Sequence, residues 1–307
     1  MGGRNMSIYK IVILIFELFS SGMSVAQEKS NVIDTAKIER LTGLKGAFNR
    51  EENVFKVSSP RNDVKISVDG RAMPPFMGLT SWVSFAAGLR EDTMIMGDLV
   101  LFQDEVNAVM SVLLQNDIKV TALHNHFFYD DPKVYFMHIN GEGKTDALAA
   151  AVGIVFNKIK EIRKNNPVPA KGFGGRQISE ENSITPKLIE DILGVKGQSQ
   201  NGMFKIVIGR KARMSCGCEV AKEMGINTWA GFAGTDDAAI ADGDFVMLES
   251  EVQPVLKALR SAGINIVALH NHMIMESPRM IFLHFWGIGS TTNLAKGLKG
   301  ALSVQHD

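Results

Sequence analysis

The spacing of apolar residues along 33–163 predicts both helices and strands. Segment 105–115 has apolar residues at every third or fourth position, the period of a helix with one buried face, and Asp104 is a suitable N-cap. Segment 145–162 returns to helical spacing, and a short helix is predicted at 33–43. Extended segments are predicted at 53–58, 64–69, 79–86, 93–102, 119–128 and 133–139. Because strands and helices mix without strict alternation, we expect an α+β fold.

This pattern occurs twice, at an offset of about 146 to 151 residues. Matched positions are Gly46 and Gly197, Phe55 and Phe204, Arg61 and Arg210, Met77 and Met224, Trp82 and Trp229, Asp98 and Asp244, Glu105 and Glu251, Pro132 and Pro278, and Gly141 and Gly287. We therefore predict two tandem copies of one unit, each with an antiparallel sheet and flanking helices. The copies should pack face to face about a pseudo-twofold axis.

The chain divides by this pattern into four parts. They are a signal peptide (1–26), a first repeat lobe (33–163), a linker (164–183) and a second repeat lobe (184–302). Arg4 and Lys10 precede a short apolar run at 11–19, and Ala26 ends a stretch of small residues that suits a signal peptidase. The alternative is a membrane anchor, but that run is shorter than the roughly 20 residues a span needs. We expect a periplasmic or secreted protein with no membrane span after signal removal.

The composition of the chain limits the classes of molecule it is expected to bind. Apolar residues make up 45% of the chain and charged residues 21%, as in soluble globular proteins. Lys plus Arg and Asp plus Glu are 33 each, and no long basic run occurs. Nucleic acid and anionic membranes require clustered positive charge, so neither is expected as the main partner. A small-molecule ligand or substrate, of unknown identity, is the remaining expectation.

Histidines carry the main functional signal. The chain has seven, and six lie in two copies of H-N-H followed by a third His: His124, His126 and His138, then His270, His272 and His284. The H-N-H pair on a strand points to one face. A hairpin centred on Pro132 would place His138 opposite His126, and one centred on Pro278 would place His284 opposite His272. Three converging imidazoles favour a divalent transition metal, with zinc the first choice. The alternative is a polar cluster without metal.

Carboxylates near the histidines are the candidate general bases. Glu276 follows the second H-N-H, at the position of Asp130 in the first copy. Glu251 begins a predicted helix, and like Glu105 it also fits an ordinary first-turn acid. Asp236, Asp237, Asp242 and Asp244 are predicted to form a polar loop, with a hard cation as the alternative.

Three further pairs are given structural roles by the sequence alone. Trp82 and Trp229 are predicted as core residues, Arg61 and Arg210 as solvated surface residues, and Cys216 and Cys218 as small residues on one strand face. The alternatives are recognition of an anionic substrate by the arginines and binding of a soft metal by the thiols.

Several of these motifs together resemble the LppY/LpqO family of bacterial envelope proteins. They are M-G-I-N-T-W at 224–229, D-G-D-F at 242–245, H-N-H at 270–272 and H-F-W-G at 284–287. The resemblance covers both copies and implies duplication and an envelope location, but no activity. The lipoproteins that name the family carry a lipidated Cys that this chain lacks, which favours a soluble exported form.

Two functions remain open from the sequence. The first is a metal-dependent hydrolase or lyase in which Glu251 or Glu276 acts as general base. The second is a non-catalytic metal- or ligand-binding envelope protein. The copies differ around their histidines, with Glu276 in place of Asp130 and Trp286 in place of Asn140. We therefore expect the second lobe to carry the function.

Overall fold

A computed structural model describes residues 33–175 and 177–306, so the predicted signal peptide lies outside the described residues. The helices of the first lobe are α1 (Thr35–Thr42), the short η1 (Pro75–Met77), α2 (Gln103–Gln115) and α3 (Thr145–Asn165). Its strands are β1 (Gly46–Asn49), β2 (Val54–Pro60), β3 (Ser67–Val68), β4 (Arg71–Ala72), β5 (Thr80–Ala87), β6 (Thr93–Phe102), β7 (Lys119–His124), β8 (Asp130–Asp131) and β9 (Val134–Gly143). The predicted elements are present, although only two residues of segment 64–69 are in a strand and the strand predicted at 119–128 ends at His124, before the second His of H-N-H.

The second lobe repeats this order. Its helices are α4 (Pro186–Leu193), η2 (Lys222–Met224), η3 (Glu249–Glu251), α5 (Val252–Ser261) and α6 (Thr291–Leu302). Its strands are β10 (Gly197–Gln200), β11 (Met203–Gly209), β12 (Ala212–Arg213), β13 (Glu219–Val220), β14 (Asn227–Thr235), β15 (Ala238–Leu248), β16 (Asn265–His270) and β17 (Met280–Gly289). The fold is α+β, as predicted.

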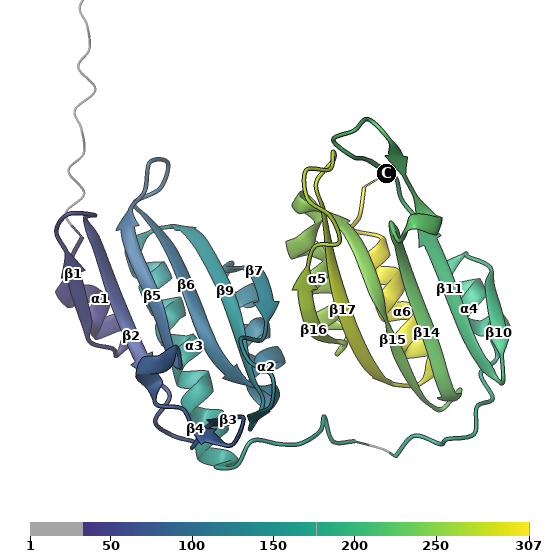
Figure 1. Cartoon of the computed structure of the whole chain (residues 1–307), viewed down its shortest axis with the longest axis horizontal. Coiled ribbons are helices and arrows are strands. Elements are labelled where there is room, and N and C mark those ends of the chain that lie inside the picture. The colour runs from purple at the N-terminus through teal and green to yellow at the C-terminus, as the bar shows by residue number, and fades with distance from the viewer. Residues whose placement is uncertain (1–32, 176, 307) are drawn as a thin grey trace, which may run out of the picture. The chain divides into compact units, whose positions relative to one another are not determined.

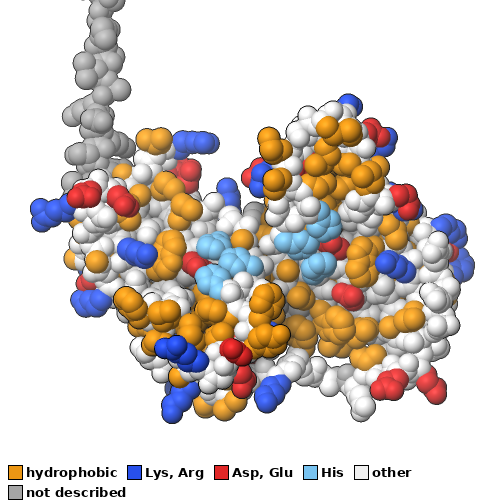
Figure 2. Space-filling model, viewed as in Figure 1, with side chains coloured by type: hydrophobic (Ala, Val, Ile, Leu, Met, Phe, Trp, Pro, Cys, Tyr) orange, Lys and Arg blue, Asp and Glu red, His pale blue; other side chains and the backbone are white. Residues whose placement is uncertain are grey.

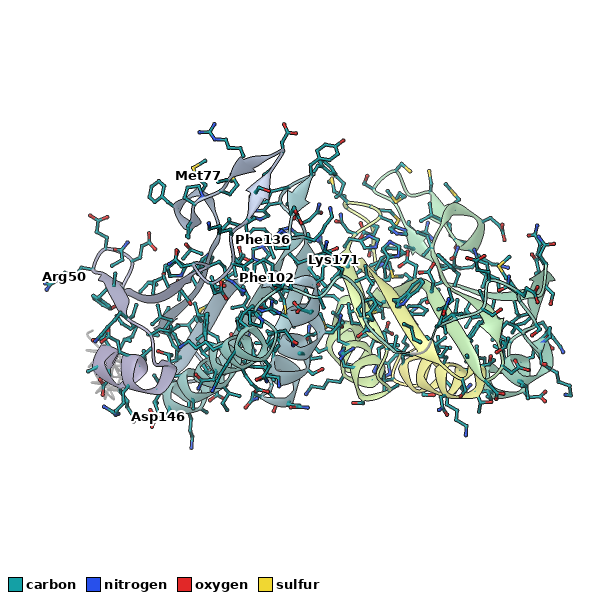
Figure 3. The ribbon with its side chains drawn as sticks, turned by 90° about the horizontal axis from the view of Figure 1, so that it is seen from below. Arg50, Met77, Phe102, Phe136, Asp146 and Lys171 are labelled. Carbon is teal, nitrogen blue, oxygen red and sulfur yellow. The ribbon has the colours of Figure 1, made fainter. Side chains whose placement is uncertain are left out.

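One antiparallel sheet of twelve strands runs through both lobes. Its order is β1-β2-β5-β6-β9-β7 followed by β16-β17-β15-β14-β11-β10, so the second half mirrors the first. In each lobe the three longer helices cover one face of the sheet (Figures 1 and 3). Alternate strand residues such as Leu123, Met137, Leu269 and Leu283 join the buried core with those helices. The opposite face therefore carries the remaining side chains of every strand.

The start of α2 is fixed by a buried ion-pair network rather than by Asp104. The helix begins at Gln103, and the Glu105 carboxylate accepts the Phe102 N–H at 2.9 Å, which is the half of a capping box that the third helical residue supplies. Arg61 donates to both oxygens of Glu105, at 2.8 and 2.9 Å. Arg61 is only 6% exposed, so its prediction as a solvated residue is wrong. A carboxylate without a partner would be costly here, since burial raises the pKa of Glu105 and Arg61 opposes that effect.

The lobes join edge to edge through β7 and β16, not face to face. Leu123 pairs with its own counterpart Leu269 in antiparallel register. The Asn107 amide bonds both backbone groups of Ile266, and the matched Gln253 amide bonds both backbone groups of Val120. Each contact from the first lobe to the second is matched by a contact between the equivalent residues in the opposite direction. The lobes are therefore related by a pseudo-twofold axis. β7 and β16 are the terminal strands of their own halves of the sheet, and this pairing covers edges that would otherwise be free.

In the part of the chain that the structure describes, no helix combines the length and apolarity required to cross a bilayer.

Replacing Asn107 by Ala should weaken the junction between the lobes. The change leaves the Ile266 N–H and C=O without the amide that holds them at 2.7 and 3.0 Å in a buried position. We expect the free energy of unfolding to fall by about 2 kcal/mol or more, measured by urea denaturation. Gln253→Ala is the matched control, and it should cost less because its contacts are only partly buried. A stability of Asn107→Ala equal to that of the wild type would contradict this role for the amide.

Candidate functional site

The alternation of side chains along β16 and β17 places the histidines on the helix-free face. In β17, Leu283 and Phe285 are buried in the core, so His284 between them points to the other face. In β16, Leu269 is in the core and His270 is on the same face as His284. Figure 2 shows histidine side chains at the surface on this face. The same pattern places His124 and His138 in the first lobe.

The predicted strand register is wrong, although the rings still converge. His284 lies opposite Ala268 rather than His272, and His138 lies opposite Ala122 rather than His126. The strands are joined by a longer irregular loop instead of a tight hairpin centred on the proline. His270 lies diagonally across from His284, and their ring centroids are 4.6 Å apart.

Asp244 completes the cluster from the neighbouring strand. It pairs with His284 across β15 and β17, and it is 3% exposed. One ligand atom each from Asp244, His270 and His284 lie within 4.8 Å of one another, so this group could hold a metal ion. The prediction of Asp244 in a polar loop is wrong, because Asp242 and Asp244 belong to β15. The Gly-Asp pair shared by both copies was the signal that could have identified it.

Burial controls the protonation of this group. Burial raises the pKa of Asp244, and His284 and His272 act in the opposite direction. Burial also lowers the pKa of His270, and the neighbouring His284 and His272 lower it further. A neutral imidazole is the form that binds a metal. The His284 Nδ1 lies 3.3 Å from the Gly243 carbonyl, and a proton on this nitrogen leaves Nε2 free as a ligand.

Two buried atoms of the cluster have no hydrogen-bond partner among the described residues. They are Asp244 Oδ1 and His270 Nε2. A buried polar atom left unpaired costs about 1–3 kcal/mol. One oxygen and two nitrogens as donors suit zinc and similar divalent transition metals. The residues therefore fit a metal ion on their own chemistry.

His272 lies beside this group. Its Nε2 is 3.2 Å from Asp244 Oδ2, and its ring stacks on Phe282 at 3.5 Å between centroids. Its side chain is 33% exposed and lines a pocket of about 660 Å³ that continues along the face. His272 thus connects the buried cluster with the pocket, and its prediction as a ligand stays a prediction.

The first lobe has the same residues in a looser arrangement. Asp98 pairs with His138 across β6 and β9, and its Oδ1 is also buried without a partner in the described part of the chain. The rings of His124 and His138 are 5.1 Å apart, and His126 stacks on Phe136. Among the described residues, only the second lobe brings three ligand atoms within 4.8 Å.

The two predicted catalytic glutamates bond to the backbone. Glu276 Oε1 accepts the Met280 N–H at 3.0 Å, and its counterpart Asp130 accepts the Val134 N–H through Oδ2 at 2.7 Å. Glu276 and Asp130 each therefore close the loop that precedes the last strand of their lobe. Glu251 pairs with Arg210 and accepts the N–H groups of Leu248 and His306, both at 2.8 Å. Nothing in these contacts directs Glu251 toward the histidines.

The tryptophans are not in the core and the cysteines are not on a strand, contrary to prediction. Trp82 and Trp229 are half-buried on the helix-free face, each with a lysine ammonium 4.1 Å from its ring, so neither is a core residue. Cys216 and Cys218 are exposed in the turn between β12 and β13, not on a strand. Asp236 accepts the Thr185 N–H and precedes β15, the strand that carries Asp244.

These features define a class: a duplicated α+β protein whose helix-free sheet face carries an aspartate and histidine cluster able to hold a metal. The chain belongs to the family described as Domain of Unknown Function (DUF1259), whose model matches residues 36–158 and 187–304. The two matches confirm the internal duplication.

No curated protein matches the chain. Among solved structures it is similar to a trimeric bacterial microcompartment shell protein, PduB, at 10% identity over 84% of this chain and 89% of that chain. The TM-score of 0.18 is too low to inform either fold or function.

Replacing Glu251 by Gln should reduce stability without altering the cluster of Asp244, His270 and His284. Burial alone would raise the pKa of Glu251, but bonds from Arg210 and from the His306 and Leu248 N–H groups outweigh it and lower the pKa. The carboxylate therefore stabilises the fold above the unfolded pKa of about 4.3, and that contribution is lost as pH falls through the lowered folded pKa. We expect a loss of about 3 kcal/mol at pH 7 that narrows in acid.

The measurement is chemical unfolding of wild type and Glu251→Gln across pH, with metal content determined in parallel. If the wild type binds metal and a folded Glu251→Gln variant of normal stability does not, Glu251 belongs to the site instead.

Proposed function

We propose that the second lobe binds a divalent transition metal through Asp244, His270 and His284, with zinc as the first choice. The observation that carries this proposal is the convergence of their ligand atoms within 4.8 Å. The unpaired Asp244 Oδ1 and His270 Nε2 support it, because a cation would satisfy both. Three protein ligands leave a fourth tetrahedral position open, which is the arrangement of catalytic rather than structural zinc.

The open position favours an enzyme, and we propose a metal-dependent hydrolase or lyase. The bound metal would supply a Lewis acid that polarises a substrate oxygen and lowers the pKa of water. His272 is the group best placed to move a proton, since it contacts Asp244 and lines the adjoining pocket. Neither Glu251 nor Glu276 is needed for this step in the proposal.

The alternative is a metal- or ligand-binding envelope protein without catalysis. A closed sphere of four protein ligands would be typical of it. The pocket of about 660 Å³ that reaches His272 and Asp244 favours the enzyme, because a substrate needs such access.

The first lobe is proposed as a weaker site. It retains Asp98, His124 and His138, but its ligand atoms do not gather within 4.8 Å among the described residues. The length of the Glu276 side chain does not account for the difference between the lobes, because its Oε1 bonds to Met280.

We also propose that the protein belongs with the LppY/LpqO envelope proteins and is periplasmic or secreted. The H-N-H and H-F-W-G motifs and the apolar run at 11–19 behind Arg4 and Lys10 support this.

Metal content of the purified, untagged protein tests the proposed site. We expect zinc in the wild type, loss of the tighter site in His284→Ala, and a smaller or no loss in the matched variant His138→Ala. The reason is that His284 is a member of the compact group and His138 is not. Elemental analysis gives stoichiometry, and titration after chelator treatment gives affinity.

His272→Ala separates the two roles of that residue. If His272→Ala keeps its metal but loses catalytic turnover, His272 fits a role in proton transfer. Separately, equal metal loss in His284→Ala and His138→Ala would contradict the proposed difference in affinity between the two lobes. A wild type that binds no divalent metal would reject the proposed function.

Export is tested at the N-terminus. Expression of the whole chain in a Gram-negative host should give a mature protein that begins at Gln27, found in the periplasm or medium. Mass spectrometry of the purified protein checks this, with a Leu14→Arg variant as the control that should stay uncleaved because a charge interrupts its apolar run. An intact N-terminus in the cytoplasm would contradict the prediction.

A further inference from the structure

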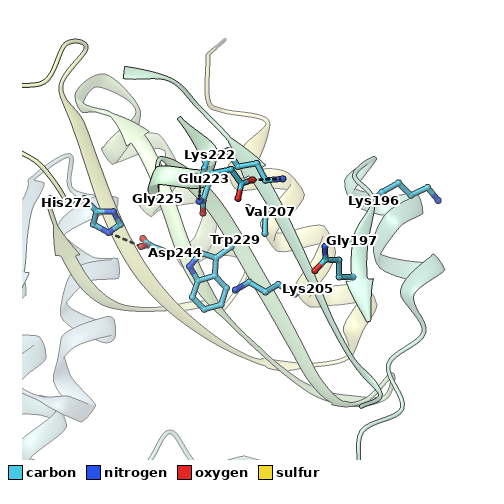
Figure 4. Close-up of a pocket in the computed structure, with 12 residues that line it drawn as sticks. Lys196, Gly197, Lys205, Val207, Lys222, Glu223, Gly225, Trp229, Asp244 and His272 are labelled. Atoms are coloured by element: carbon cyan, nitrogen blue, oxygen red, sulfur yellow. Dashed lines mark hydrogen bonds and ion pairs between the residues drawn. The ribbon is translucent and has the colours of Figure 1, made fainter. Parts of the chain in front are cut away.

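The pocket beside the metal cluster is a groove on the helix-free face of the second lobe. It measures about 660 Å³. Its walls come from the starts of β10 and β14, from β11 and from η2, and one end is formed by Asp244 and His272 (Figure 4). A ligand in this groove would therefore reach the cluster.

A straight row of residues runs from the cluster into the groove. His284, Asp244, Trp229 and Val207 are cross-strand neighbours on β17, β15, β14 and β11. Core packing of Phe204 and Ile206 sends Lys205 to the same face, where its ammonium lies 4.1 Å from the Trp229 ring centroid. Figure 4 shows Trp229 between Asp244 and Lys205.

The charge of the groove away from the cluster is positive. Lys196, Lys205 and Lys222 line it. Lys196 is paired with Glu190, and Lys222 is 3.7 Å from Glu223. Lys205 has no carboxylate partner in the described part of the chain, and only the Trp229 ring positions its ammonium. An anion could replace water at this ammonium without breaking an ion pair.

We infer that this groove binds a small organic anion, with its carboxylate or phosphate on Lys205, its body on Trp229 and its far end at the cluster. The inference rests on the proposed function for the claim that this anion is the substrate. Lys205 is two strands from Asp244 and two residues out of register with it, which places their Cα atoms about 12 Å apart. That span fits a molecule the size of an aromatic acid or a sugar phosphate, and a longer chain is not required.

The first lobe supplies an internal comparison. It retains the same pair, with Lys56 Nζ 4.1 Å from the Trp82 ring. At the positions of Lys222 and Glu223 it has Pro75 and Phe76, the latter 95% exposed. The first lobe thus has the platform without the cation at the position of Lys222 and without the compact cluster, so Lys56 is a matched control.

The test is calorimetric titration with named probes. Phenyl phosphate, benzoate and glucose 6-phosphate are compared with the neutral benzyl alcohol and glucose, on zinc-loaded and on chelator-treated protein. The proteins are wild type, Lys205→Gln and Lys56→Gln, each checked for unchanged metal content and stability.

We expect at least one anion to bind more tightly than its neutral counterpart. Lys205→Gln should weaken that binding about fivefold to tenfold, and Lys56→Gln should leave it unchanged. The phosphate and carboxylate probes show which anionic group is preferred.

The inference is overturned if no anion binds more tightly than the neutral probes, or if Lys205→Gln binds like wild type. It is also overturned if Lys56→Gln weakens binding as much as Lys205→Gln. Binding that depends on Lys205 in a protein unable to take up metal would reject the proposed function and leave the anion groove in place.

Discussion

The register between β15 and β17 is the constraint on which the candidate site depends. Antiparallel pairing sets Asp244 directly opposite His284, and strand alternation sends both away from the core that takes Leu283 and Phe285. A slip of one residue would bury the polar pair and expose the apolar one, so the packing energy of the core also fixes the positions of Asp244 and His284. The helices cover a single face, which leaves the other face for chemistry.

Buried acids in this fold divide into two kinds. Glu105 and Glu251 are each held by an arginine and by the backbone N–H at the start of the following helix, and each anchors a different additional segment. Arg163 joins Glu105 in the first lobe, whereas the His306 N–H joins Glu251 in the second. Asp244 instead faces imidazoles and has an unpaired oxygen. Glu276 combines both features, since its Oε1 accepts the Met280 N–H and its buried Oε2 has no partner among the described residues. Asp244 differs from it in lying within reach of two imidazole ligand atoms.

The sequence predicted what depends on periodicity and repetition. Helices α2 and α3, the strands that end at the first His of each H-N-H and the duplication all follow from apolar spacing and matched motifs, whereas His126 and His272 lie beyond the strands predicted to hold them. It failed where position depends on partners distant in the chain. The register of β16 with β17 depends on an irregular loop, so counting from Pro278 gave the wrong neighbour for His284. Asp244 and Trp229 were misassigned because only the pairing of β14 with β15 shows that they share an open face with the histidines.

The junction at Leu123 and Leu269 has the form of a contact between two identical subunits, because each residue meets its own counterpart. Within one chain, the linker holds the two edges at a high effective concentration, so association does not depend on the amount of protein. Two lobes joined in one chain need not have identical sequences, because a substitution in one lobe is not repeated in the other. One lobe can therefore have a compact cluster and a basic groove while the other keeps only some of the corresponding residues.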